Sequence, residues 1–134
     1  MSGATVAAAQ DSGSEIRSSP LIAEAAQAAA PGDIVFKTGE AFWGRLAARF
    51  SPNEVGWGHV GIAALDASGA LIVIHAGGDP LSPQGRVQET PFAAFIGPSQ
   101  AFALYRPVME ATRIGAAIEY AAEAARRNAP FDLG

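Results

Sequence analysis

Two histidines, His59 and His75, are the residues of this sequence whose type and spacing best suit proton transfer, and the sequence contains no others. Imidazole performs proton transfer at neutral pH better than any other unperturbed side chain. His59 opens the apolar run 59–65 and His75 lies near the end of the run 71–76, so both are expected on strands. Two histidines on paired strands predict a general base and a partner that orients it. The nucleophile that such a pair would activate is not visible, because the sequence contains no cysteine.

The relative position of the two histidines depends on the turn between their strands. A three-residue loop at 67–69, with Gly69 in the left-handed conformation, is a common solution for a hairpin. This loop places His75 opposite Gly61, on the same face as His59 and diagonal to it, with about 7–8 Å between the two backbones. A loop of two or four residues would instead put the histidines on opposite faces of the hairpin.

The elements around this hairpin are expected from hydrophobic periodicity and from stop signals. Helices are predicted at 21–29, 40–50 and 111–128, together with a helical turn at 91–95 that Thr90 caps. Further strands are predicted at 33–37, 86–89 and 101–106. Together these predict an α+β fold with a small, mostly antiparallel sheet of about five strands, curled towards a half-barrel, and helices packed on one side. Residues 1–18 are expected to form a flexible arm, and residues 19–134 one domain.

Composition excludes several classes of protein. The 134 residues carry a formal net charge of −4 at pH 7 and have a sequence pI near 5.0, which argues against a nucleic-acid partner. The absence of cysteine excludes disulfides and thiolate metal sites within the sequence. No apolar stretch approaches the ~20 residues that a transmembrane helix needs. The first ten residues lack the features of a convincing secretory signal, so the localisation stays open.

The order of several motifs resembles one family, the circularly permuted NlpC-type papain-like cysteine hydrolases (YiiX/YaeF-like). The similarity covers about residues 31–134. The segments that carry it are Gly32-Asp33-Ile34-Val35-Phe36, Gly58-His59-Val60-Gly61-Ile62, Val73-Ile74-His75-Ala76, Val87-Gln88-Glu89-Thr90-Pro91-Phe92-Ala93-Ala94-Phe95, Leu104-Tyr105-Arg106 and Pro130-Phe131-Asp132.

The resemblance implies a papain-like fold and assigns roles to individual residues. His59 matches the general base of the family, and His75 matches the polar residue that orients that base. Asp132 is expected on the substrate side of the site from its position in the family. Trp57 is a candidate for lining a substrate groove on other grounds, because it lies next to the His59 strand. In the permuted branch the nucleophilic cysteine follows the Tyr/Phe-Asp element, and this sequence has no counterpart for it. The implied activity is hydrolysis of peptide or acyl amide bonds without a cofactor, here in a truncated or inactive form. Cell-wall peptides are the substrates that the non-permuted relatives suggest.

Two alternatives come from other classes of protein. The first is a non-catalytic module that binds a peptide or acyl ligand in a papain-like groove. The second is a metal-binding protein that uses both histidines, with a third ligand from Asp79, Glu89 or Asp132. A separate candidate, Arg106, could contact an anionic substrate or could be a surface arginine at the end of a strand.

Overall fold

The computed structural model describes five stretches of the chain, which are residues 4–8, 20–38, 57–77, 84–99 and 101–132. The helix predicted at 40–50 and the candidate metal ligand Asp79 lie outside these residues.

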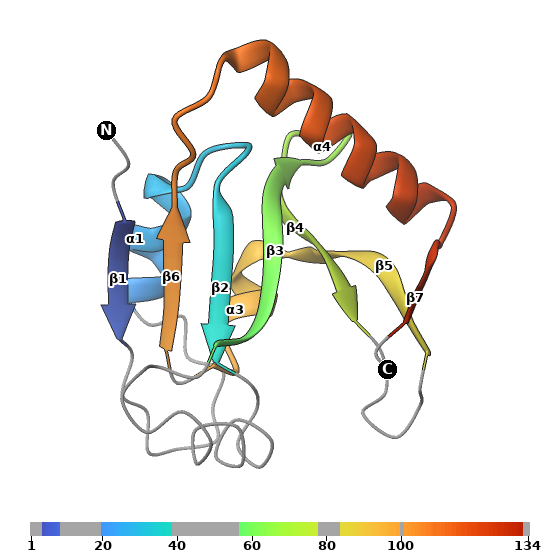
Figure 1. Cartoon of the computed structure of the whole chain (residues 1–134). Coiled ribbons are helices and arrows are strands. Elements are labelled where there is room, and N and C mark those ends of the chain that lie inside the picture. The colour runs from blue at the N-terminus through green and yellow to red at the C-terminus, as the bar shows by residue number, and fades with distance from the viewer. Residues whose placement is uncertain (1–3, 9–19, 39–56, 78–83, 100, 133–134) are drawn as a thin grey trace.

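The fold is α+β and is built on one fully antiparallel sheet (Figure 1). Its seven strands lie in the order β1-β6-β2-β3-β4-β5-β7. Their bounds are β1 Ala4–Ala8, β2 Ile34–Thr38, β3 Trp57–Leu65, β4 Leu71–Gly77, β5 Gln84–Pro91, β6 Ala101–Tyr105 and β7 Pro130–Asp132. The sheet is strongly twisted, since β5 runs across the view of Figure 1 in which β6 and β2 stand upright.

The expected number of strands, about five, describes the centre of this sheet and omits its edges. β1 pairs with β6 at one edge, and β7 pairs with β5 at the other. β1 lies within the segment 1–18 that was expected to be an arm, so part of that segment belongs to the sheet. β7 has only three residues, too few for a periodic signal, and the five residues of β1 are mostly alanine, which marks neither face of a strand.

The hairpin of β3 and β4 has the predicted turn and register. Gly69 adopts a φ of +84°, a left-handed conformation that glycine tolerates without strain. Asp66 Oδ1 accepts hydrogen bonds from the backbone N–H groups of Ser68 at 2.8 Å and Ala70 at 2.9 Å, which fixes the turn. As a result Gly61 lies opposite His75.

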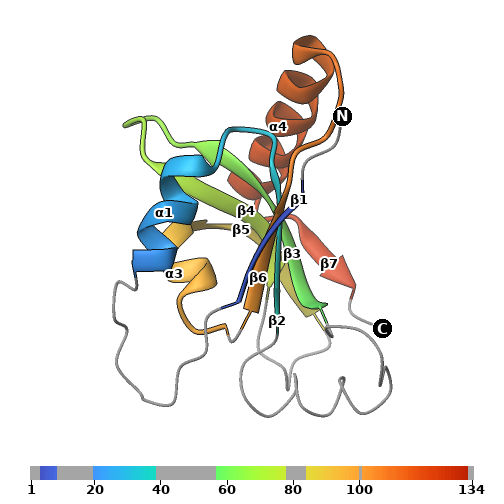
Figure 2. The same ribbon diagram turned by 90° about the vertical axis from the view of Figure 1, so that its left-hand side faces the viewer.

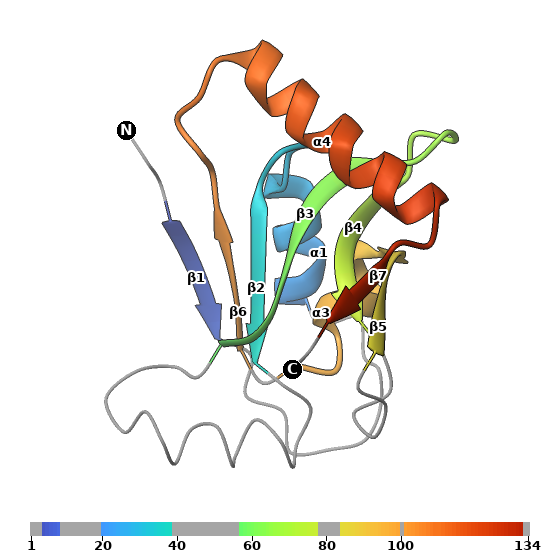
Figure 3. The ribbon, with the colours of Figure 1, turned by 45° about the vertical axis from the view of Figure 1, so that its right-hand side comes forward.

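Helices cover both faces of the sheet, and the expectation of helices on one side is wrong. α1 (Pro20–Ala28) and α3 (Phe92–Ile96) lie on one face, while α4 (Ala111–Arg126) crosses the other (Figures 2 and 3). The α1/α3 face holds a core that includes Val35, Val73 and Phe95. The α4 face holds a second core.

Strand β4 explains why both faces need cover. Val73 points into the core under α1 and α3, while its neighbours Ile72 and Ile74 point into the core under α4. All three side chains are at most 6% exposed. A strand that is buried on both faces appears in the sequence as a continuous apolar run rather than an alternating one.

Helix α4 covers only part of its face. Its inner side chains Ile118 and Ala122 are half-buried against the sheet, and none of its residues is fully buried. Val60 of β3 and Tyr105 of β6, which project to this same face, remain 52% and 39% exposed.

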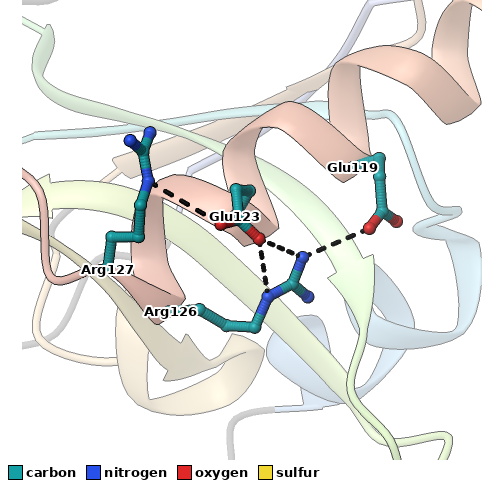
Figure 4. Close-up of polar contacts among 4 residues, drawn as sticks. All are labelled: Glu119, Glu123, Arg126 and Arg127. Carbon is teal, nitrogen blue, oxygen red and sulfur yellow. Dashed lines mark hydrogen bonds and ion pairs between the residues drawn. The ribbon is translucent and has the colours of Figure 1, made fainter.

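The outer side of α4 carries a cluster of ion pairs near its C-terminal end (Figure 4). Arg126 contacts Glu123 at 2.7 Å and Glu119 at 3.2 Å, and Arg127 lies 3.8 Å from Glu123. All four side chains are more than half exposed, so solvent screens these pairs and they stabilise the helix only weakly.

Candidate functional site

His59 lies on β3, two residues beyond the last residue pair that joins β3 to β4. The pairing of these two strands ends at Gly61 and His75, whereas β3 stays paired with β2 through His59 and Lys37. His59 shares its face of the sheet with Ala63, which belongs to the core under α1 and α3. The residue is exposed, so solutes can reach this position.

His75 lies on the same face, and two neighbours hold its ring. Nε2 of His75 is 2.8 Å from Oγ1 of Thr90 on β5, and the ring centroid is 4.7 Å from that of Phe95 on α3. Within the part of the chain that the structure describes, the buried Nδ1 of His75 has no hydrogen-bond partner. The ring is therefore fixed at one nitrogen and by packing, which suits a residue that positions another group.

The environment of His75 favours its neutral form. Burial is the main reason that the pKa of His75 is lowered, since a charged imidazolium loses hydration there. The backbone at Ala76 opposes this shift in pKa, while the positive charges of Lys37 and His59 add to it.

Two glycines leave room around His75. A Cβ atom on Gly61 would lie 2.3 Å from Cγ1 of Val73 and 3.1 Å from Cβ of His75. A Cβ atom on Gly77 would lie 3.1 and 3.2 Å from Cε1 and Nδ1 of the His75 ring. A larger residue at Gly77 would therefore meet the imidazole ring, and one at Gly61 would clash with Val73 beside it.

Lys37 is a member of this cluster that the sequence alone did not single out. It is 9% exposed, and its Nζ lies 4.4 Å from the centroid of the Phe95 ring. Phe95 thus contacts both Lys37 and His75 from the helix side. The alternation along 33–37 places Lys37 on the face of Val35, but only the pairing of β2 with β3 shows that this face also carries His59.

The role expected of Thr90 is wrong. Thr90 is a strand residue opposite Val73, and its hydroxyl meets His75 rather than capping α3. Pro91 holds the N-cap position of α3, where no side-chain cap is formed. The sequence Thr-Pro predicts a helix start, and tertiary pairing of β5 with β4 overrides that local preference.

The other two predicted site residues lie at different distances from the histidines along the sheet. Trp57 begins β3, two residues before His59, and pairs with Thr38 next to a β-bulge. Asp132 ends β7 and pairs with Gln84 of β5, so two strands, β4 and β5, separate its strand from β3. The side chains of Trp57 and Asp132 lie outside what the structure describes.

Arg106 has a structural role rather than the substrate contact considered above. Its guanidinium donates to both carboxylate oxygens of Asp33 at 2.9 Å and to the carbonyl oxygen of Ala28 at 2.8 Å. Asp33 also accepts from the backbone N–H of Ala30. This network joins the end of α1 to the start of β2 and to the residue after β6.

Neither a metal site nor a membrane-spanning helix is found among the described residues. No group of three or more histidine, aspartate or glutamate residues there could hold a metal ion, and Glu89 lies on the face opposite His75. The helices described are also too short or too polar to cross a bilayer.

Comparison with known proteins gives no relative for this chain. No protein family, curated protein or solved structure matches it. The chemistry of the site has to be inferred from its own residues.

Proposed function

We propose that this chain is the histidine-bearing part of a permuted NlpC-type papain-like cysteine hydrolase that acts on peptide or acyl amide bonds. One observation carries the proposal, which is the shared sheet face of His59 and His75. An exposed imidazole on the same face as a fixed one whose neutral form is favoured suits a general base and its positioning residue. The α+β fold with an antiparallel sheet is the coarse architecture that the resemblance implies.

The mechanism gives His59 the proton-transfer steps. A cysteine thiol has an ordinary pKa near ~8.5, so only a small fraction is thiolate at neutral pH unless a neighbouring imidazole takes the proton. The thiolate would attack the carbonyl carbon, and protonated His59 would then donate to the leaving amine. In the second half of the reaction His59 would accept a proton from the water that releases the acyl group. The positioning role that the resemblance gives to His75 would fall to its Nδ1, because Nε2 meets Thr90 and Nδ1 has no hydrogen-bond partner among the described residues.

The nucleophile must come from outside these residues, since the sequence has no cysteine. This observation favours a second candidate, a non-catalytic module that binds a peptide or acyl ligand on the same face. Such a module would keep the fold and the histidines but perform no covalent step.

Reading the coding sequence beyond codon 134 and testing the full translation product separates the two. If a cysteine follows, we expect iodoacetamide to alkylate it at pH values well below the ordinary pKa of a thiol. His59→Ala should remove this low-pH reactivity, while His75→Gln should weaken it and the remote Arg113→Ala should leave it unchanged. A cysteine that reacts alike with and without His59 would contradict the hydrolase, and a coding sequence without cysteine would leave the binding module.

A further inference from the structure

Gln88 is a polar residue that the mechanism above does not use, although it lies on the same face as both histidines. It belongs to β5 and pairs with His75 of β4, so the two side chains project from one face of the sheet. Gln88 is exposed, and no hydrogen bond joins its side-chain amide to another described residue. The polar atoms of this amide are therefore available to a bound molecule.

Gly77 of β4 allows the amide of Gln88 to lie across the neighbouring strand. A Cβ atom on Gly77 would lie 2.5 Å from Nε2 of Gln88, which is closer than two such atoms can approach. The amide thus occupies the space that a side chain at position 77 would fill. It leans over β4 instead of extending straight out from β5.

This direction carries the amide towards the part of the face that bears His59. The last pair that joins β3 to β4 is Gly61 and His75. From that pair, His59 lies two residues towards the start of β3, and Gly77 lies two residues towards the end of β4. In an antiparallel hairpin these are the same direction, and both residues keep the face of the pair. The amide of Gln88 is therefore displaced from His75 towards the exposed imidazole of His59.

A side-chain amide suits a particular kind of ligand group. It offers N–H donors and a carbonyl acceptor without a net charge, which complements the C=O and N–H of a peptide group. We propose that Gln88 is a substrate-binding residue that forms a hydrogen bond with a peptide group next to the bond at His59. The inference rests on the proposed function. It selects peptides with a second amide group over simple acyl amides, whose apolar chain offers the side chain no partner.

Binding can be measured on the 134-residue chain itself, because it needs no nucleophile. The chain is titrated with N-acetyl-dialanine methylamide, which contains successive peptide groups, and with octanamide, an acyl amide with an apolar chain. NMR follows the side-chain NH₂ resonances of Gln88 and the ring of His59. The dialanine probe is expected to shift both sets of resonances saturably, and octanamide is expected to bind about threefold or more weakly.

Substitutions at Gln88 test its part in binding. Gln88→Leu should weaken binding of the dialanine probe by about threefold to tenfold, because a hydrogen bond to the ligand is lost. Gln88→Ala is a second variant with the same expected direction. Both should keep the free energy of unfolding nearly unchanged, since the residue is exposed and urea denaturation can confirm it. Gln27→Leu, which removes an exposed glutamine from α1, should bind as the wild-type chain does.

Three results would overturn the inference. They are no saturable binding of the dialanine probe, binding of octanamide as tight as that of the probe, and undiminished binding to folded Gln88→Leu and Gln88→Ala variants. None of these results bears on whether His59 activates a thiol. A thiol that reacts alike with and without His59, with peptide binding at Gln88 intact, would in turn reject the hydrolase and keep the peptide site.

Discussion

At the scale of single residues, the environment of His75 consists of one hydroxyl group, one aromatic ring and two glycines. Thr90 meets Nε2, Phe95 packs against the ring, Gly77 leaves room for the ring, and Gly61 leaves room for Val73 and the Cβ of His75. Because these neighbours come from β3, β4, β5 and α3, the position of the imidazole depends on the whole local fold.

Removing the hydroxyl of Thr90 should destabilise the chain. Thr90→Val keeps the shape of the side chain but leaves Nε2 of His75 without its partner, so the free energy of unfolding should fall by about 1 kcal/mol. Thr90→Ser, which keeps the hydroxyl, should lose less. Urea denaturation of both variants at pH 7.5 measures the difference, and equal stability of Thr90→Val and the wild-type chain would refute this contact.

The sequence was sufficient for the local relation between the histidines and insufficient for their surroundings. The turn with Gly69 at its left-handed position determines that Gly61 lies opposite His75. The turn and the two strands that it joins are close in sequence, so a local pattern is enough to predict this pairing. Lys37 and Phe95 reach the same site through pairing of β2 with β3 and packing of α3, and no local pattern encodes either contact.

At the scale of elements, the turn that follows α1 shows how helix α4 is seated. Gly32 has a φ of +95°, and a Cβ atom there would lie 2.3 Å from Cγ2 of Ile114 on α4. The N–H of Gly32 donates to the carbonyl oxygen of Ala63, so the turn is also tied to β3. One glycine therefore serves both a left-handed turn and a close helix contact.

Substituting this glycine should loosen α4. Gly32→Ala combines an unfavourable φ with a clash against Ile114, so we expect the free energy of unfolding to fall by more than about 1 kcal/mol. Gly115→Ala is the matched control. A Cβ atom there meets nothing within 4 Å, and alanine should stabilise the helix by about 0.5–1 kcal/mol. Thermal unfolding that shifts in the same direction for both variants would contradict this role.

The errors in the predicted elements have a common cause. Periodicity gave α1, α4 and the central strands within a few residues, because each has an apolar side of sufficient length. Periodicity could not assign the helices to opposite faces of the sheet. β4 is apolar on both faces, so its sequence does not indicate which helix packs on which face.

At the scale of the whole molecule, stability should depend on pH through His75. Its pKa in the folded chain lies below that in the unfolded chain, chiefly because of burial, so the unfolded chain binds more protons as the pH falls. The stabilising contribution is present above the ordinary imidazole pKa of about 6.5 and is lost as the pH falls towards the folded-state value.

This dependence can be isolated by substitution. The free energy of unfolding of the wild-type chain should decrease between pH 7.5 and 5, and His75→Gln should flatten that decrease. Asp66 and Glu123 also have lowered pKa values, but any stability that these carboxylates contribute is lost at more acidic pH than this range. Urea unfolding at several pH values tests this, and an equal slope for the wild-type and His75→Gln chains would exclude His75 as the source.

The central claim is that His59 and His75 interact across one face of the sheet, with His75 held neutral. The most direct measurement is an NMR titration of the His75 ring in the wild-type, His59→Ala and Arg113→Ala chains. We predict a pKa of His75 below the ordinary imidazole value in the wild-type chain, a rise when His59 is removed, and no change with Arg113→Ala. A His75 ring that titrates at or above the ordinary value, or whose pKa ignores the loss of His59, would contradict the claim.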